Sequence, residues 1–154
     1  MPLLLAHPRV DVNLQDTDGN TALMEACTHN IEAVKALIAA PNINVNLQNK
    51  WGYTALIRAC IHNKVEVVKA LIAAPNINVN LQNKDGNTAF MKACEYNRRE
   101  IVKILLAHQH MWPLDKIVYN LYLKYGLSAA KIIVLLGKGI VVSSLLLGLL
   151  YYAH

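Results

Sequence analysis

The chain has 154 residues, of which 55% are hydrophobic, 16% charged and 6% aromatic, and its formal net charge is +5. This length suits a single domain with an aliphatic core. The basic residues are scattered among acidic ones rather than gathered in a patch, which argues against a nucleic-acid partner. Three cysteines are too few and too sparse for a disulfide framework, and they fit a reducing, cytoplasmic setting.

The first segment, MPLLLAHPRV, lacks the charged start and the long apolar run of a secretory signal. Residues 3–8 match the end of a helix that recurs later, at residues 105–108, so the chain begins partway through a repeating unit. Solenoids need polar caps at their ends to stay soluble. We therefore expect this half unit either to be poorly ordered or to dock on another surface, for example in self-association with a second copy.

Three similar units follow, and the segment PNINVNLQNK occurs twice without change, at residues 41–50 and 75–84. A Gly-Xaa-Thr-Ala marker begins at Gly19, Gly52 and Gly86, so the periods are 33 and 34 residues. Self-similarity at this period indicates a solenoid, because a single unit cannot bury its apolar face alone.

Each unit predicts a tight turn followed by a first short helix. The marker glycine suits a turn that needs a positive φ. Threonines two residues later are placed to cap the helix: Thr21, Thr54 and Thr88. We expect these helices over residues 22–29, 55–62 and 89–96. Each is followed by an asparagine that we expect to end it in the left-handed conformation: Asn30, Asn63 and Asn97.

A second helix follows in each unit, with apolar residues at the i, i+3, i+4 spacing of a helix face. Pro41 and Pro75 end the first two of these helices. The apolar positions are Val34, Leu37 and Ile38, then Val68, Leu71 and Ile72, then Val102, Leu105 and Leu106.

These units resemble the ankyrin repeat, whose pattern is D-x-x-G-x-T-P-L-H-x-A-x-x-x-G-H-x-E-I-V-K-L-L-L, and the match covers residues 3–110. The resemblance implies an all-α ankyrin-repeat solenoid with β-hairpin-like tips, three clear repeats after a half repeat, and a domain over residues 1–110. In the second unit the matching residues are Gly52, Thr54, Leu56, Ala59, Cys60, Glu66, Val67, Val68, Lys69 and Leu71.

The units depart from this pattern in their turns and linkers. The first unit lacks one residue between its helices, which explains the period of 33. The family's Thr–His turn hydrogen bond is not expected, because the histidine is replaced in every unit. Alanine replaces the proline of T-P-L-H at Ala22, Ala55 and Ala89, and the histidine becomes Met24, Ile57 or Met91.

The positions that change between units lie at the hairpin tip and on the first helix. We interpret the constant residues as contacts between stacked units and the changing ones as a binding surface. The resemblance implies the same, since ankyrin proteins bind partners with this concave face. Trp, Tyr and Arg dominate binding hot spots, although Trp51 could instead cover the neighbouring hairpin. The expected partner-binding residues are Trp51, Tyr53, Arg58, His62, Asp85, Lys92 and Tyr96.

Catalytic, metal and cofactor sites are not predicted. Cys27, Cys60 and Cys94 occupy equivalent positions on helices about 8–10 Å apart, too far for a disulfide, and indicate core packing. The histidine pairs, His29 with His62 and His108 with His110, have no grouped Cys or carboxylate that would complete a zinc site. Motifs of hydrolases, metalloproteases and phosphate-binding loops are absent from the sequence.

Residues 111–154 predict a hydrophobic helical C-terminal segment with two competing interpretations. Residues 132–153 carry one charge, Lys138, and are long enough to span a hydrocarbon core. Against a membrane anchor, Lys138 would lie inside the bilayer, and Gly137 and Gly139 divide the segment. The residues that would enter the membrane are Leu145, Leu146, Leu147, Leu149, Leu150, Tyr151 and Tyr152.

The other interpretation makes residues 111–140 a degenerate fourth repeat that caps the stack. Residues 130–140, AKIIVLLGKGI, resemble an ankyrin second helix and its exit. An apolar tail, residues 141–154, then remains without an assigned place.

The function we expect is a non-catalytic protein–protein interaction module in the cytoplasm, binding an unidentified partner protein through its hairpin tips and first helices. The alternative is a membrane-tethered adaptor held on the cytosolic face by the C-terminal segment. A third interpretation is a remnant of a longer repeat protein, in which binding would be vestigial.

Overall fold

The computed structural model describes residues 10–108, which belong to the first of the chain's two units, Met1–Trp112. The N-terminal half repeat, the fourth repeat and the membrane anchor lie outside the described residues and stay predictions, as does the domain boundary at residue 110. No helix within residues 10–108 is long and apolar enough to cross a membrane. The helices are α2 (Ala22–His29), α3 (Ile31–Ile38), α4 (Ala55–Ile61), α5 (Val65–Ile72), α6 (Ala89–Glu95) and α7 (Arg99–Ala107).

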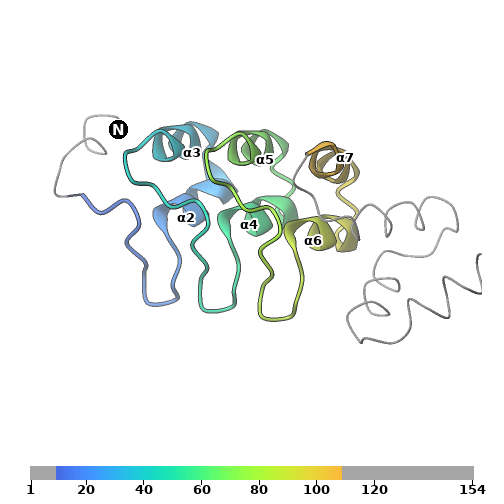
Figure 1. Ribbon diagram of the computed structural model, residues 1–154, viewed down its shortest axis with the longest axis horizontal. Helices are drawn as coiled ribbons and strands as arrows, with labels where there is room; N and C mark the ends of the chain where they lie inside the picture. Colours follow the sequence, from blue (N-terminus) through green and yellow to red (C-terminus); the bar gives the residue numbers. More distant parts are fainter. Residues whose placement is uncertain (1–9, 109–154) are drawn as a thin grey trace, which may run out of the picture. The chain divides into compact units, whose positions relative to one another are not determined.

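The helices form three pairs that stack side by side (Figure 1). The first helices, α2, α4 and α6, make one row, and the second helices, α3, α5 and α7, make another. Within the first row α4 contacts both α2 and α6, and within the second row α5 contacts both α3 and α7. The loops before the first helices project as hairpins from the first row, away from the second. The predicted all-α solenoid of three repeats is confirmed for these residues.

Each first helix begins at the predicted threonine. The hydroxyls of Thr21, Thr54 and Thr88 accept a hydrogen bond from the main-chain N–H three residues later, at 3.2 Å in all three repeats. This bond satisfies one of the N–H groups that a helix start leaves unpaired, and such a cap contributes about 1 kcal/mol. The recurrence of the cap explains why threonine follows the marker glycine in every unit.

The asparagines between the two helices do not all behave alike. Asn63 and Asn97 have the predicted left-handed conformation, with φ of 57° and 55°. The same prediction is wrong for Asn30, which is extended at φ −142° and caps α3 by accepting hydrogen bonds from the N–H groups of Glu32 and Ala33. The first unit is one residue shorter here, so Asn30 must both follow α2 and start α3.

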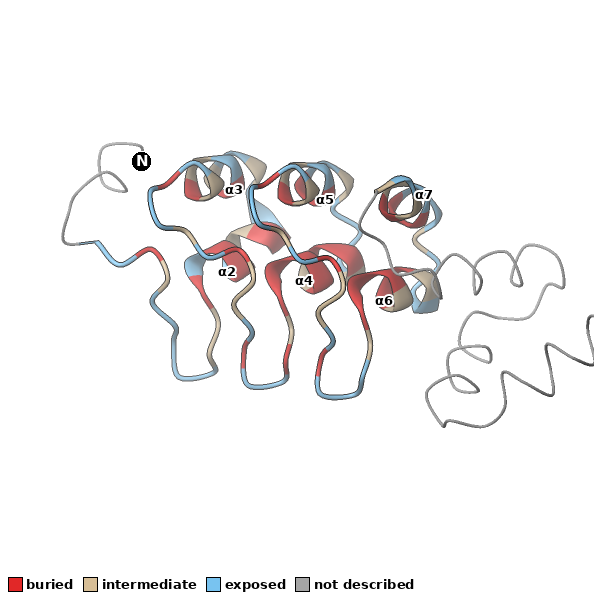
Figure 2. Cartoon of the chain, viewed as in Figure 1, coloured by how far each residue is buried: buried red, intermediate tan, exposed pale blue. Residues whose placement is uncertain are grey.

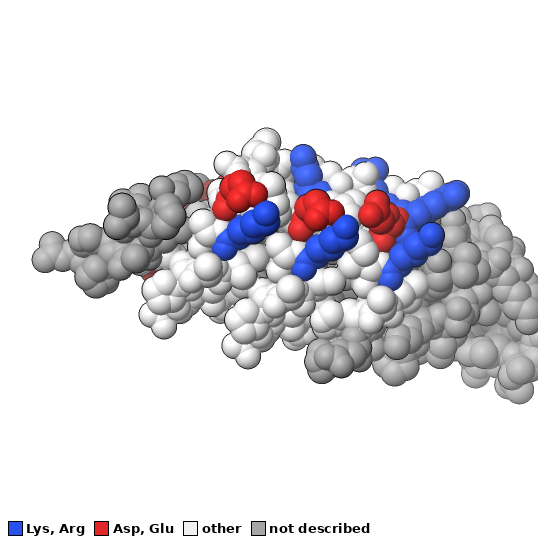
Figure 3. Space-filling view, turned by 90° about the horizontal axis from the view of Figure 1, so that it is seen from above, with Lys and Arg blue, Asp and Glu red and all other residues white. Residues whose placement is uncertain are grey.

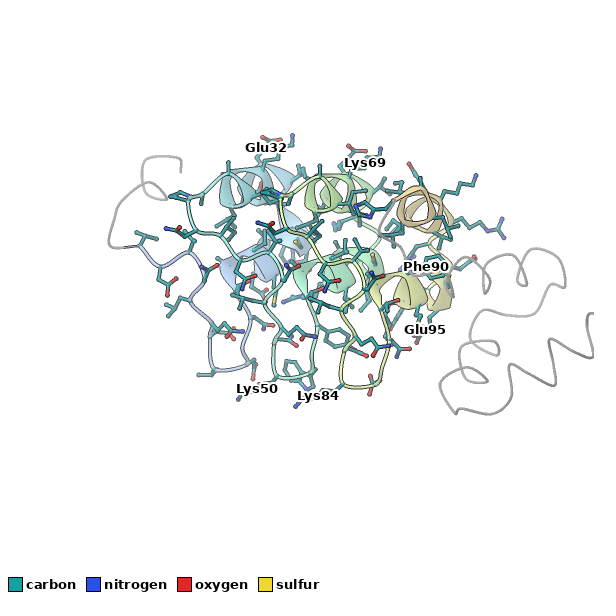
Figure 4. The ribbon with its side chains drawn as sticks, in the orientation of Figure 1. Glu32, Lys50, Lys69, Lys84, Phe90 and Glu95 are labelled. Atoms are coloured by element: carbon teal, nitrogen blue, oxygen red, sulfur yellow. The ribbon has the colours of Figure 1, made fainter. Side chains whose placement is uncertain are left out.

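Buried residues lie on the helices of both rows (Figure 2), so the core is formed between the two rows. Leu23, Leu56 and Phe90 occupy the same position in successive repeats, and each is 1% exposed. Burying one side chain of this size contributes about 1.5–3 kcal/mol. Phe90 points into the space between α6 and α7 (Figure 4).

Side-chain amides of the constant segment tie each repeat to the next. The Nε2 of Gln48 donates to the Gly52 carbonyl oxygen of its own hairpin at 2.7 Å and to the Gln82 carbonyl oxygen of the next repeat at 2.8 Å. Gln15 makes the equivalent pair of bonds one repeat earlier, to Gly19 and Gln48. The interpretation of the constant residues as contacts between units is therefore confirmed for this position.

Asparagines make a second set of bonds between repeats. The Nδ2 of Asn46 donates to the Asn76 carbonyl oxygen at 2.7 Å, and its Oδ1 accepts from the Asn78 N–H at 2.9 Å. Asn13 does the same one repeat earlier, with Asn42 and Asn44. One amide therefore uses both its donor and its acceptor on the main chain of the next repeat, which fixes the register of the stack.

The hairpins are closed by main-chain bonds and joined to one another. In the second repeat the Asn49 N–H donates to the Tyr53 carbonyl oxygen at 3.0 Å, and the Lys84 N–H of the next hairpin donates to the Trp51 carbonyl oxygen at 3.0 Å. This confirms tips that resemble β-hairpins. Within the described residues, an isolated antiparallel β-bridge joins Gln15 to Thr21 in the first hairpin.

The marker glycines allow a matched test of what the close stacking of hairpins requires. Gly52 and Gly86 share a φ of 79°, but a Cβ on Gly52 would lie 2.8 Å from the Lys84 nitrogen, whereas one on Gly86 would meet nothing described within 4 Å. We expect Gly86→Ala to cost about 1 kcal/mol for the left-handed backbone alone. Gly52→Ala should cost about 1–3 kcal/mol more, because the neighbouring hairpin must move.

Urea unfolding followed by circular dichroism measures both variants against the wild-type chain. Equal losses for Gly52→Ala and Gly86→Ala would show that only the turn conformation, and not the approach of the next hairpin, requires glycine.

Candidate functional site

Trp51 lies at the tip of the second hairpin on a main chain whose polar groups are all in use. Its N–H donates to the Asn49 Oδ1 at 3.0 Å, and its carbonyl oxygen accepts from the Lys84 N–H. The residue is nevertheless 51% exposed. The main chain that carries the indole is therefore held in place, while about half of the residue's surface is open to solvent.

Asp85 holds the equivalent place on the third hairpin and is exposed. Its N–H donates to the Asn83 Oδ1 at 3.1 Å, and its Oδ2 accepts from the Asn83 Nδ2 at 3.1 Å. The tips of the second and third hairpins thus have similar main-chain hydrogen bonds but different side chains, the apolar Trp51 and the acidic Asp85. Lys50 and Lys84 extend from the ends of the hairpins, and Glu95 extends from α6 on the same side (Figure 4).

Tyr53 and Arg58 are half-buried and belong partly to the stack itself. The Arg58 Nη1 donates to the Glu25 Oε1 of the preceding repeat, and the Arg58 side chain is 19% exposed. The ion pair joins α4 to α2. Arg58 therefore contributes to the cohesion of the repeats as well as to the surface on which the sequence placed it.

Lys92 is the expected binding residue that the structure places deepest. It is 8% exposed, and its Nζ donates to the Glu95 Oε2 at 2.8 Å. Burial disfavours the charged ammonium, but the Glu95 carboxylate outweighs burial and raises the pKa of Lys92. Tyr53 and Tyr96 lie close enough to favour the charge further. Lys92 thus offers a partner little surface of its own.

His62 and Tyr96 occupy equivalent positions at the ends of α4 and α6, and both are exposed. Their main-chain N–H groups close the last turn by donating to Arg58 and Lys92 carbonyl oxygens at 3.0 Å. The main chain is thus held in place while both rings remain accessible to a partner.

Arg98 is a surface residue that the sequence analysis missed. Its guanidinium lies 5.9 Å from the centre of the Tyr96 ring and donates through Nη2 and Nε to the Ile61 carbonyl oxygen, at 3.0 and 3.3 Å. Arg98 therefore joins the third repeat to the end of α4. The signal available in the sequence was its position, where Lys64 and Arg98 differ between otherwise similar units.

The opposite side of the stack, formed by the second helices, has a different character. Seen from above, acidic and basic side chains alternate along the row of second helices (Figure 3). The pairs Glu32–Lys35 and Glu66–Lys69 have separations of 2.9 and 2.7 Å and are largely exposed. Exposed pairs of this kind form a solvated face, and they contribute little to stability.

Comparison with protein families identifies these repeats. The family model described as ankyrin repeats in three copies matches residues 1–83 and 32–120. The chain belongs to the ankyrin-repeat family. Ankyrin repeats are in general protein–protein interaction modules and are typically non-catalytic. A search of curated proteins found no match.

This ankyrin domain replaces a polar turn contact of the family pattern with packing. The position of the pattern's histidine is taken by Met24 and Ile57, which are 1% and 0% exposed. A buried apolar side chain needs no hydrogen-bond partner, so Met24 and Ile57 fill this position by packing alone.

The cysteines of this ankyrin domain differ in how deeply they lie in the stack. Cys27 and Cys60 are fully buried, and Cys94 is partly exposed. Burial raises the pKa of the Cys27 thiol to about 12 and also raises that of Cys60. Among residues 10–108 no three His, Cys, Asp or Glu side chains are grouped as a metal site would require. The arrangement is that of packing residues rather than of nucleophiles.

Thiol labelling tests this assignment. At about pH 8, iodoacetamide should modify Cys94 first, while Cys27 and Cys60 stay protected because burial keeps them as neutral thiols. Protection of both should be lost when urea unfolds the domain. Rapid labelling of Cys60 in the folded chain, identified by peptide mass, would show that the stack opens at its centre.

The His62 imidazole has a lowered pKa in this fold, and the prediction has a definite sign. Partial loss of water disfavours its charged form, and the neighbouring Arg58, Lys64, His29 and Arg98 act in the same direction. As the pH falls through about 6.5, the His62 ring takes up a proton more readily in the unfolded chain than in the folded one, so acidification favours unfolding. Above that pH the ring is neutral in both states, and its contribution to the stability of the fold is fully present.

An NMR titration of the His62 ring should give a midpoint below that of an unfolded peptide. The variant His62→Gln should flatten the decrease in stability between about pH 7 and pH 5. An unchanged pH dependence would assign the acid sensitivity to other groups.

Proposed function

We propose that this ankyrin domain binds a partner protein through its hairpin tips and first helices, with Trp51 as the central anchor. The observation that carries the proposal is the half-exposed indole of Trp51 on a main chain already committed to bonds with its own and the next hairpin. A large aromatic side chain with two χ angles, carried by a fixed main chain, binds with little loss of conformational entropy.

The residues that join the repeats differ from the residues that are exposed, and this supports the proposal. Constant residues such as Asn46 and Gln48 use their amides on the next repeat. Trp51, Asp85, His62 and Tyr96 differ between repeats or project from them, and all are exposed on the side of the hairpins and first helices. The second helices present paired charges instead, which suits solvent better than a partner (Figure 3).

The function proposed is binding without catalysis or a cofactor, in the cytoplasm. The membrane-tethered adaptor and self-association through the N-terminal half repeat depend on residues outside the described range, and both stay predictions.

Peptides selected from a random display library on the immobilised full chain provide the probe for this surface. We expect Trp51→Ala to weaken the selected peptides about 30-fold or more, the loss of about 2 kcal/mol that defines a hot spot. The melting temperature should change little, because the indole is only half-buried. Arg58→Ala is the poorer test, because it also removes the ion pair with Glu25.

Glu32→Ala on the second-helix face serves as the matched control and should leave the affinity unchanged. Selected peptides that tolerate Trp51→Ala but not Glu32→Ala would place the binding face on the second helices and contradict the proposal.

A further inference from the structure

Basic side chains gather where the first helix leads into the second. His62 ends α4, and its imidazole is within electrostatic reach of Arg58, Lys64, His29 and Arg98. The group draws on all three described repeats: His29 from the first, Arg58, His62 and Lys64 from the second, and Arg98 from the third. Because the units are stacked, residues far apart in the sequence form one surface.

One basic side chain of this group forms an ion pair with a carboxylate, and two do not. Arg58 is paired with Glu25. The other ion pairs among residues 10–108 are Lys35–Glu32, Lys69–Glu66 and Lys92–Glu95, so neither Lys64 nor Arg98 takes part in one. Beside the row of alternating charges, Figure 3 shows further basic side chains. Among the described residues, the exposed Lys64 and the half-buried Arg98 therefore carry positive charges that no carboxylate neutralises.

Arg98 is held in position although its charge is not neutralised. Its guanidinium uses Nη2 and Nε on the neutral Ile61 carbonyl oxygen and lies over the Tyr96 ring. A guanidinium has five N–H donors in a rigid plane, and two of these bonds leave donors for a carboxylate. A fixed arginine loses less conformational entropy on binding than a free one.

We propose that Lys64, Arg98 and His62 form the part of the binding surface that takes an acidic segment of the partner protein. This inference rests on the proposed function and adds to it the chemistry of the ligand. Carboxylates would pair with Lys64 and Arg98, and an aromatic side chain beside them could contact Tyr96, which is 44% exposed.

The repeat spacing suggests how the acidic residues should be arranged. Lys64 and Arg98 are equivalent residues of consecutive repeats, which stack about 8–10 Å apart. A polyproline II chain has three residues per turn and rises about 3.1 Å per residue, so carboxylates three residues apart lie on one face at about this distance. The best simple ligand is therefore a chain of this conformation with an acidic residue at every third position.

Fluorescence anisotropy with the labelled peptide DSSDSSDSSD and the full chain tests the proposal at about 20 mM salt, where exposed charges are weakly screened. The peptide NSSNSSNSSN, of the same shape without charge, should not bind. Lys64→Glu should weaken the acidic peptide about fivefold or more, and Lys64→Arg should retain it. Lys64→Glu should also fold, because an acidic side chain suits the N-terminus of α5.

Lys103→Glu in α7 is the matched control, since it reverses the charge of an exposed lysine outside this group. It should leave the affinity within about twofold of wild type. Equal losses for Lys103→Glu and Lys64→Glu would reduce the effect to net charge and overturn the proposal, as would failure of the acidic peptide to bind. If library peptides still bind and still require Trp51, the proposed function stands without this inference. If neither the acidic peptide nor any library peptide binds, the proposed function and this inference are both contradicted.

Discussion

The side-chain amides between repeats are the interaction on which the rest of this structure depends. A hairpin of a few residues has too little core to hold its own shape. Here Gln15 and Gln48 each bond a carbonyl oxygen of their own hairpin and one of the next. Each hairpin is thereby closed and positioned by the same side chain. Replacing either glutamine would break both of its bonds, and glutamine accordingly recurs at this position in the third repeat, as Gln82.

This constraint explains why the surface can vary. Because Asn46 and Gln48 bond main-chain atoms, the next repeat needs only its backbone in the right place, not any particular side chain at the tip. Trp51 and Asp85 can therefore occupy equivalent positions with opposite chemistry. The scaffold is specified by amides acting on main chain, and the recognition surface is left to the side chains that point away from it.

The fold could be predicted from the sequence because it is built from signals that recur. The period of the marker glycine, the threonine cap and the apolar spacing of the second helices each appear in every repeat, and all three are confirmed. Asn30 was mispredicted because the register of neighbouring repeats was applied to a unit that is one residue shorter. A local length change alters which residue must cap a helix, and similarity between units does not reveal this.

The candidate surface could be predicted only in outline. A comparison of units shows which positions vary, but it does not show how deeply they lie or with which groups they pair. Lys92 varies and yet is nearly buried against Glu95. Arg98 also varies, and its role becomes visible only once α6 lies beside α4 and the guanidinium reaches the Ile61 carbonyl oxygen. These contacts cross a repeat boundary, so they depend on the stack rather than on any single unit.

The same stacking has a consequence for recognition. Exposed charges on a flexible chain bind weakly, because each must be ordered when a partner arrives. The Arg98 guanidinium is ordered in advance by the end of α4 and by the Tyr96 ring, and the main chain of Trp51 is held by two hairpins. The bonds that join the repeats are thus also the bonds that hold the exposed groups still. Cohesion of the solenoid and preorganisation of its surface arise from one set of contacts, and weakening the first should weaken the second.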